Sequence, residues 1–222
     1  MITAVLWDFG GVILTSPFEA FNRFERERGL PIDFIRTVNA TNPDRNAWAR
    51  LERSDISPFE FDAAFADDAA ALGRDVRGSD VLTLLAGDVR PTMVQLLDRV
   101  IAAGFKVACL TNNVVSSGDV VSSGESTVAS DRSAEIAAIM QRFHAVVESS
   151  KVGVRKPEPR FYEIACELLD VQPTDCAFLD DLGINLKPAA AMGMRTIKVL
   201  TAEQAIDDLT ALLGLDDERP DR

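Results

Sequence analysis

Four apolar segments of this chain are each followed by polar side chains of complementary chemistry. In chain order the polar residues are Asp8, Thr111 with Asn112, Lys156, and Asp180 with Asp181. Three carboxylates gathered in one place would repel and raise one another's pKa values, unless a cation lies among them. A hard ion with oxygen ligands, such as Mg²⁺, meets that need. The lysine, the threonine hydroxyl and the backbone N–H of Asn112 are donors suited to phosphate oxygens.

Asp8 is the member of this set that could act as a nucleophile. It follows the apolar run Ala4–Trp7 and precedes two glycines, Gly10 and Gly11. A carboxylate at the carboxyl end of a buried strand lies where open α/β sheets bind their ligands. On this stretch alone, an aspartate that caps a turn before the glycine pair is the alternative interpretation. The decision depends on what the other strand ends supply.

The elements that must position these residues alternate between strands and helices. Apolar runs predict strands at residues 4–7, 105–110, 145–147, 176–179 and 195–200, with helical patterns between the later ones. This alternation predicts an α/β fold with a doubly wound, parallel, Rossmann-like sheet. Because parallel strands end at one edge of the sheet, the polar groups that follow them should meet there.

Residues 16–88 contain no convincing strand and predict a helical insertion after the first strand. The tetrapeptide Ser-Pro-Phe-Glu occurs at residues 16–19 and again at residues 57–60, and each copy has the composition of a capping box at a helix start. The predicted organisation is an α/β core formed by residues 1–15 and 89–222, with residues 16–88 as a smaller all-helical unit.

Aromatic residues of this helical unit have two interpretations. Trp48, Phe59, Phe61 and Phe65 are candidates for the lining of a substrate pocket. A stripe of this kind is more often the unit's own hydrophobic core.

A duplicated segment follows the second predicted strand. The hexapeptides Val114–Asp119 and Val120–Glu125 differ only in their last residue, and the sequence stays rich in serine and threonine to Ser133. Such a composition buries little apolar surface, which predicts a mobile loop over residues 114–130. The next helix is then expected from about Ala134 to Arg142.

The overall composition excludes several classes of partner. The chain has 222 residues and a formal net charge of −12, without a cluster of basic residues. We therefore expect neither nucleic acid nor a membrane surface as a partner. No apolar run is long enough for a membrane span or a signal peptide, which predicts a cytoplasmic protein. We expect it to be a monomer or a homodimer. Cys109, Cys166 and Cys176 lack metal-ligand spacing, so we expect buried, reduced thiols.

At this point the constellation resembles the haloacid dehalogenase superfamily of hydrolases with an aspartate nucleophile. Asp8 matches the first motif of that superfamily, Thr111 the second, Lys156 the third, and Asp180-Asp181 the fourth. Two stretches, residues 148–159 and 178–189, are especially similar to the N-terminal phosphatase domain of soluble epoxide hydrolase. These matches span nearly the whole chain.

The resemblance implies a Mg²⁺-dependent phosphatase with a small phosphorylated metabolite as its substrate. Asp8 would attack phosphorus and form an aspartyl phosphate. The resemblance assigns Mg²⁺ to Asp8, the backbone carbonyl of Gly10 and Asp181, with Asp180 as an outer partner. It assigns the phosphoryl oxygens to Thr111, Asn112 and Lys156, and makes residues 16–88 a cap that selects the substrate.

One position departs from the pattern of the phosphatases. They carry a second aspartate two residues after the nucleophile, as general acid and base, and this chain has Gly10 there. The resemblance therefore leaves two alternatives open. A 2-haloacid dehalogenase needs no such acid because halide leaves without a proton, but dehalogenases of this superfamily lack the adjacent carboxylates seen here at Asp180-Asp181. The other alternative is a binding or regulatory protein that keeps the fold and the metal site but turns over poorly or not at all.

The only histidine, His144, lies between Phe143 and the third predicted strand. It is away from the strand ends that carry the polar set. We therefore expect a structural rather than a catalytic role.

Overall fold

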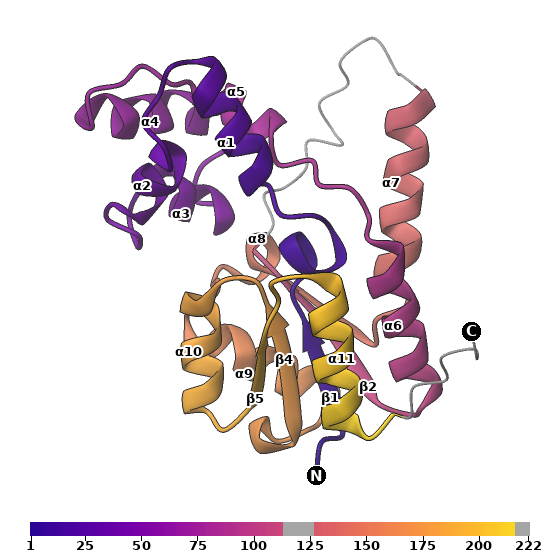
Figure 1. The fold of residues 1–222 in the computed structure, drawn as a ribbon. Helices are drawn as coiled ribbons and strands as arrows, with labels where there is room; N and C mark the ends of the chain where they lie inside the picture. The colour runs from indigo at the N-terminus through magenta and orange to yellow at the C-terminus, as the bar shows by residue number, and fades with distance from the viewer. Residues whose placement is uncertain (113–126, 216–222) are drawn as a thin grey trace.

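A parallel sheet of five strands forms the centre of the molecule (Figure 1). The structure, a computed structural model, describes residues 1–112 and 127–215. The strands are ordered β3-β2-β1-β4-β5, and their bounds are β1 (Ala4–Trp7), β2 (Lys106–Thr111), β3 (Ala145–Glu148), β4 (Cys176–Asp180) and β5 (Arg195–Lys198). The predicted doubly wound α/β fold is confirmed.

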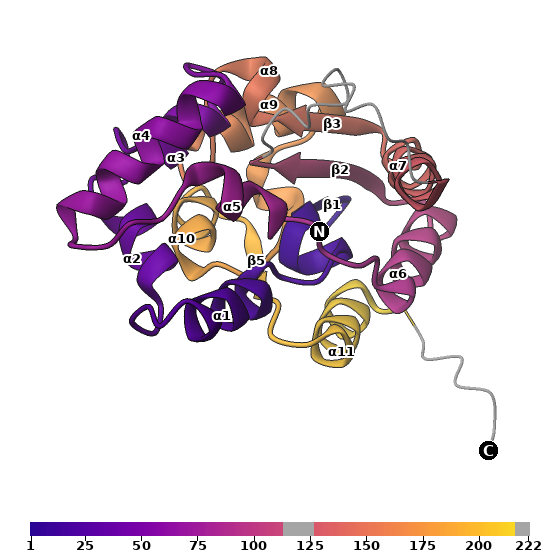
Figure 2. The ribbon, with the colours of Figure 1, turned by 90° about the horizontal axis from the view of Figure 1, so that it is seen from above.

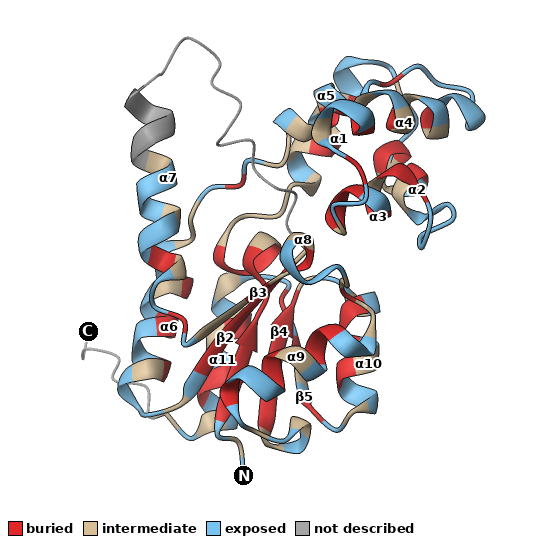
Figure 3. Cartoon of the chain, turned by 180° about the vertical axis from the view of Figure 1, so that it is seen from behind, coloured by how far each residue is buried: buried red, intermediate tan, exposed pale blue. Residues whose placement is uncertain are grey.

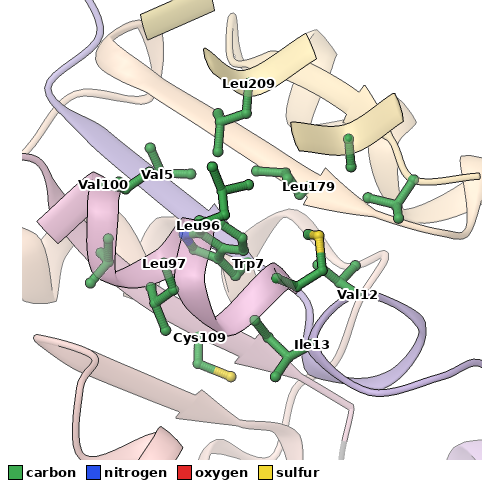
Figure 4. Close-up of a cluster of buried hydrophobic side chains, with 14 of the residues drawn as sticks. Val5, Trp7, Val12, Ile13, Leu96, Leu97, Val100, Cys109, Leu179 and Leu209 are labelled. Atoms are coloured by element: carbon green, nitrogen blue, oxygen red, sulfur yellow. The ribbon is translucent and has the colours of Figure 1, made fainter. Parts of the chain in front are cut away.

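Helices cover both faces of the sheet, because successive side chains of a strand point to opposite sides. Val5 and Trp7 of β1 face the layer of α6 (Pro91–Ala102), α7 (Thr127–Met140) and α11 (Ala202–Leu213) (Figure 4). Ala4 and Leu6 face the layer of α9 (Pro159–Leu169) and α10 (Gly183–Ala191). All four residues of β1 are fully buried, as expected for the central strand of a doubly wound sheet. The neighbouring strands β2 and β4 are also largely buried (Figure 3).

The segment after β1 is helical, and it forms a hydrophobic cluster of its own above the carboxyl ends of the strands (Figures 1 and 2). Its helices are α1 (Phe18–Glu27), α2 (Phe34–Ala40), α3 (Ala47–Glu52), α4 (Pro58–Ala71) and α5 (Gly78–Thr83). The sequence did not predict α5. We call this segment, residues 16–88, the helical insertion. Phe21, Ile35 and Phe65 are among the buried side chains that its cluster shares.

Two chain segments connect the helical insertion to the core, and they run side by side. An antiparallel bridge joins Leu14 to Val89, and the Thr15 N–H donates to the Asp88 carbonyl at 2.8 Å. A Cβ atom on Gly87 would lie 2.4 Å from the Thr15 carbonyl oxygen, so this close approach requires glycine.

The two Ser-Pro-Phe-Glu copies fold differently. Ser57 caps α4 in a complete capping box with Glu60, as predicted. Ser16 makes no cap bond to α1, whose N-cap position is Pro17. The prediction of a capping box at Ser16 is therefore wrong, because the Ser16 hydroxyl donates instead to Asp181, 165 residues away.

Helix α7 begins at Thr127, earlier than the predicted start near Ala134. The end of the predicted mobile loop is thus helical, because α7 extends back through the Ser/Thr-rich sequence. Residues 113–126, which carry the rest of that prediction, lie outside the described residues.

The aromatic residues of the helical insertion differ in how far their side chains are buried. Phe61 and Phe65 are fully buried in its cluster, and Trp48 contacts the Phe61 ring edge-on with centroids 5.8 Å apart. These three form part of the insertion's own core. Phe59 is 90% exposed and belongs to no such core.

His144 and the three cysteines lie away from the polar groups at the strand ends and have structural positions. His144 Nδ1 accepts a hydrogen bond from the Val107 N–H at 3.0 Å, which joins β2 to the start of β3. The three cysteines are free and buried, as predicted. Within the described part of the chain, no helix is long and apolar enough to cross a membrane.

Candidate active site

Asp8 lies at the carboxyl end of β1, where the backbone turns sharply through Phe9–Ile13, a segment whose two glycines have non-helical backbone angles. Its side chain is buried, with 8% of the residue exposed. Asp8 Oδ1 accepts a hydrogen bond from the Phe9 N–H at 2.6 Å and lies 2.8 Å from Lys156 Nζ. Because both contacts use Oδ1, they orient the carboxylate, and neither of them occupies Oδ2.

Lys156 joins two carboxylates at the carboxyl ends of the neighbouring strands β1 and β4. Its Nζ lies 2.8 Å from both Asp8 Oδ1 and Asp180 Oδ2, and only 1% of the residue is exposed. Burial lowers the pKa of an ammonium, but Asp180 and Asp8 outweigh it here and raise the pKa of Lys156. The lysine therefore stays charged throughout the physiological range.

Asp180 is the most extensively hydrogen-bonded carboxylate of the site. Its Oδ1 accepts from the Leu182 N–H at 2.8 Å, and its Oδ2 accepts from Lys156 Nζ. Asn185 Nδ2 lies 3.0 Å from both oxygens, and the Tyr162 hydroxyl donates to the Asn185 carbonyl at 2.6 Å. Four donor contacts on two oxygens leave Asp180 better suited to orienting Lys156 than to direct metal ligation.

Asp181 faces the turn after β1. Its Oδ2 accepts a hydrogen bond from Ser16 Oγ at 3.1 Å, which attaches the start of the helical insertion to the site. Gly11 has φ +79°, and a Cβ there would lie 2.3 Å from Asp181 Oδ2. Glycine is therefore required at position 11 both by the backbone and by the carboxylate packed against it.

Thr111 and Asn112 follow from β2, the strand next to β1. Thr111 is the last residue of β2 and is buried. The Asn112 side chain accepts from the Lys156 N–H at 2.8 Å and donates to the Lys156 carbonyl at 3.0 Å. This two-way clamp fixes the backbone of Lys156 relative to the end of β2.

Gly10 has an ordinary extended backbone, with φ −70° and ψ 131°. Apart from the adjacent residues in the chain, a Cβ atom at this position would have no neighbour within 4 Å. Nothing in the described structure therefore requires glycine at position 10, in contrast to Gly11.

The carboxylates come close enough to share one ion. One oxygen each from Asp8, Asp180 and Asp181 lie within 4.8 Å of one another. Burial raises the pKa of Asp8 well above its usual value, with Lys156 opposing the shift, and burial together with Asp180 raises the pKa of Asp181. Three carboxylates and one ammonium leave excess negative charge, and oxygen donors of this kind suit Mg²⁺.

Sequence reasoning missed several residues that organise this site. The pattern at Ser16 favours a helix cap, and no pattern assigns a role to Asn185, Tyr162, Glu52 or Arg155. Asn185 is four residues beyond Asp181, in the first turn of α10, and that spacing was a usable signal. Arg155 directly precedes the predicted site residue Lys156, whereas Tyr162 and Glu52 are brought to the site only by tertiary contacts.

A buried aspartate follows the first strand of this doubly wound sheet, and a lysine and two further aspartates lie at the same edge. This arrangement defines a hydrolase class. A model of the haloacid dehalogenase-like hydrolase family matches residues 2–193. The chain belongs to that family.

Curated relatives match over nearly the whole chain. Acyl-CoA dehydrogenase family member 10 of Mus musculus is 34% identical over 216 residues, and bifunctional epoxide hydrolase 2 of Mus musculus is 28% identical over 219 residues. The matches cover 95% and 94% of this chain, which spans only 19% and 38% of those relatives. Phosphatase MT3486 of Mycobacterium tuberculosis is 30% identical, and 95% of each chain is covered.

Solved structures share the fold. A haloacid dehalogenase-family enzyme of Bacteroides thetaiotaomicron, in complex with magnesium and inorganic phosphate, matches with a TM-score of 0.56 and 20% identity over 89% of this chain and 94% of that one. L-2-haloacid dehalogenase of Xanthobacter autotrophicus, with chloropropionic acid covalently bound, matches with a TM-score of 0.57 and 21% identity over 95% and 83%.

Proposed function

We propose that this protein is a Mg²⁺-dependent phosphatase that acts on a small phosphorylated metabolite through an aspartyl phosphate on Asp8. The observation that carries the proposal is the group of Asp8, Asp180 and Asp181 within 4.8 Å, with Lys156 bonded to two of them. A phosphate dianion could not approach Asp8 unless cations offset the negative charge of this group.

Asp8, Asp181 and the backbone carbonyl of Gly10 would hold the metal, with Asp180 as an outer partner. The donor chemistry fits a hard ion, because every proposed ligand is an oxygen. The hydrogen bonds of Asp180 to Lys156, Leu182 and Asn185 support its place as the outer partner. Mg²⁺ would supply charge neutralisation between Asp8 and the phosphate.

Asp8 would attack phosphorus through Oδ2 while the oxygen–phosphorus bond to the leaving group breaks. Lys156, the Thr111 hydroxyl and the Asn112 N–H would hold the phosphoryl oxygens. Water would then hydrolyse the aspartyl phosphate and restore the Asp8 carboxylate. The covalent intermediate divides one difficult displacement into two easier ones. No carboxylate at position 10 is present to transfer a proton in either step.

Residues 16–88 are proposed to form the cap that selects the substrate, on a core of residues 1–15 and 89–222. The hydrogen bond from Ser16 to Asp181 supports this role, because the insertion begins at the proposed metal site. The likeness to Phosphatase MT3486 over 95% of both chains supports the reaction class.

A 2-haloacid dehalogenase is the second candidate, and Gly10 is the observation that favours it. Halide departs without a proton, so that reaction needs no acid at position 10. Asp181 weighs against it, because an unneutralised carboxylate close to Asp8 would repel a carboxylate substrate.

A substrate panel separates the candidates. Phosphorylated metabolites and 2-chloropropionate are each incubated with and without Mg²⁺, and released phosphate and halide are measured. The proposal predicts phosphate release that requires the metal. Halide release without the metal would favour the dehalogenase, and release of neither ion would favour a binding or regulatory protein.

Mg²⁺ is expected to stabilise the folded protein, since it would bind the native carboxylate group alone. A ligand at about 100 times its Kd contributes about 2.7 kcal/mol, or roughly 5–10 °C in Tm for a chain of this size. Thermal unfolding with and without millimolar Mg²⁺ measures the effect. Asp181→Asn should remove most of this increase in Tm. Asp67→Asn changes an exposed residue of α4 and should leave the increase unchanged.

The Mg²⁺ increment should also grow with pH. A carboxyl whose pKa is raised by folding contributes stability below its unfolded pKa, near 3.9, and loses it as pH rises through the folded value. Burial raises the pKa of Asp8 and of Asp181 in this way. Protons therefore compete with Mg²⁺ for these two carboxylates, and they compete less as pH rises. The rise in Tm that Mg²⁺ produces should be larger at about pH 8 than at about pH 5. Equal increments would contradict the assigned ligands.

A further inference from the structure

Glu52 is a buried carboxylate at the boundary between the helical insertion and the core. It ends helix α3, and only 5% of the residue is exposed. Its Oε2 forms an ion pair with Arg155 of the core. The second guanidinium nitrogen, Arg155 Nη2, donates to the Pro43 carbonyl at 2.9 Å. Arg155 therefore binds both a carboxylate and a backbone carbonyl of the insertion.

The same carboxylate oxygen lies close to the proposed phosphate-binding residues. Arg155 directly precedes Lys156, whose backbone N–H and carbonyl are both clamped by the Asn112 side chain. Asn112 Nδ2 also lies 3.5 Å from Glu52 Oε2. Glu52 thus contacts both loops that meet at this clamp, one after β2 and one after β3.

We propose that Glu52 is a positioning residue, which uses Arg155 and Asn112 to hold the Lys156 backbone in place when the helical insertion is docked. It does not touch the reacting atoms. The effect on turnover rests on the proposed phosphatase function, whereas the effect on the Lys156 backbone does not.

Charge and burial support this role over a simple surface contact. A buried carboxylate is rarely retained without a partner, because transfer from water penalises the charged form. Glu52 and Arg155 neutralise each other at a boundary between two units, so the pair is complete only when the units are together. Docking of the insertion and placement of Lys156 are then linked through one ion pair.

A neighbouring contact across the same boundary provides a matched control. Ser54 Oγ donates to the Ser150 carbonyl at 3.1 Å, and this hydrogen bond is exposed. No contact described for Ser54 reaches Lys156 or Asn112. Ser54→Ala therefore weakens the boundary without removing a contact to the clamp.

The test compares Glu52→Gln, Arg155→Gln, their double variant and Ser54→Ala in the full chain. Amide hydrogen exchange reports on the Lys156 N–H, which donates to Asn112 Oδ1. We expect about tenfold faster exchange there in both single variants, and little change in Ser54→Ala. The effect of the double variant should be smaller than the sum of the two single effects, because both single variants break the Glu52–Arg155 ion pair.

A second readout is kcat and KM, measured with the phosphate ester that the unmodified protein hydrolyses fastest. Misplaced binding groups should lower kcat by about tenfold to a hundredfold with a smaller change in KM. Unchanged exchange at Lys156, or faster exchange spread evenly over the whole chain, would overturn the proposal. If the unmodified protein hydrolyses no phosphate ester, the proposed function fails, and exchange at Lys156 still decides whether Glu52 positions it. Glu52→Asp keeps the charge and serves if Glu52→Gln does not fold.

Discussion

Asp8→Asn is expected to abolish phosphate-ester hydrolysis, with a loss of about 10⁴-fold or more for every substrate. A carboxamide has the size of the carboxylate but is a far weaker nucleophile, so the covalent intermediate cannot form. Initial rates on alkyl, aryl and acyl phosphates, with saturating Mg²⁺, measure the loss. Asp67→Asn, an exposed change of the same kind, should retain the parent rate.

The folded state should tolerate this substitution. Burial raises the pKa of Asp8, which means that its charged form is disfavoured in the folded protein. A neutral side chain of equal size removes that penalty, while Lys156 keeps its contact with Asp180 at 2.8 Å. The metal-free Tm should therefore stay the same or rise. Substantial residual turnover in a folded Asp8→Asn variant would exclude Asp8 as the nucleophile.

Gly10→Asp is expected to raise turnover, most strongly for alkyl phosphates. General acid–base catalysis contributes about 10² to 10⁴ in rate, or about 3 to 5 kcal/mol of barrier. Alkoxide leaving groups need a proton most, whereas aryl and acyl phosphates have leaving oxygens that are weak bases. In the unmodified protein the aspartyl phosphate also lacks a base for its hydrolysis, so it should accumulate. Rapid quenching followed by phosphoprotein detection measures that accumulation.

The backbone is open to this change. Gly10 has φ −70° and ψ 131°, and a Cβ there meets no atom within 4 Å beyond the adjacent residues in the chain. Gly10→Asn adds the same bulk without an acid, so it should give no gain in rate. If Gly10→Asp folds and binds Mg²⁺ normally yet gives no gain on alkyl phosphates, the missing acid does not limit the protein. The dehalogenase or binding interpretation would then be favoured.

Gly11 gives a contrasting result in the same turn. Its φ is +79°, and a Cβ atom there would lie only 2.3 Å from Asp181 Oδ2, which leaves no room for a side chain. Gly11→Ala should therefore lower both Tm and Mg²⁺ affinity. The structure thus requires glycine at position 11 but not at position 10, and the sequence alone does not distinguish these two adjacent glycines.

The sequence alone determined the sheet, the helical insertion and the four strand ends that carry polar groups. Those features depend on local signals, such as the apolar run Ala4–Trp7 and the capping box at Ser57. The common edge of Asp8, Lys156 and Asp180 followed because parallel strands must end on the same side. Each inference needed only neighbouring residues and one rule of topology.

Tertiary structure decided which polar atoms bond to which. Ser16 and Ser57 begin identical tetrapeptides, but one donates to Asp181 and the other caps α4. Glu52 meets Arg155 across 103 positions of sequence. No local pattern can specify such pairs, because a short polar side chain bonds to whichever partner the packed chain brings within about 3 Å. That partner is fixed only when the insertion and the core come together.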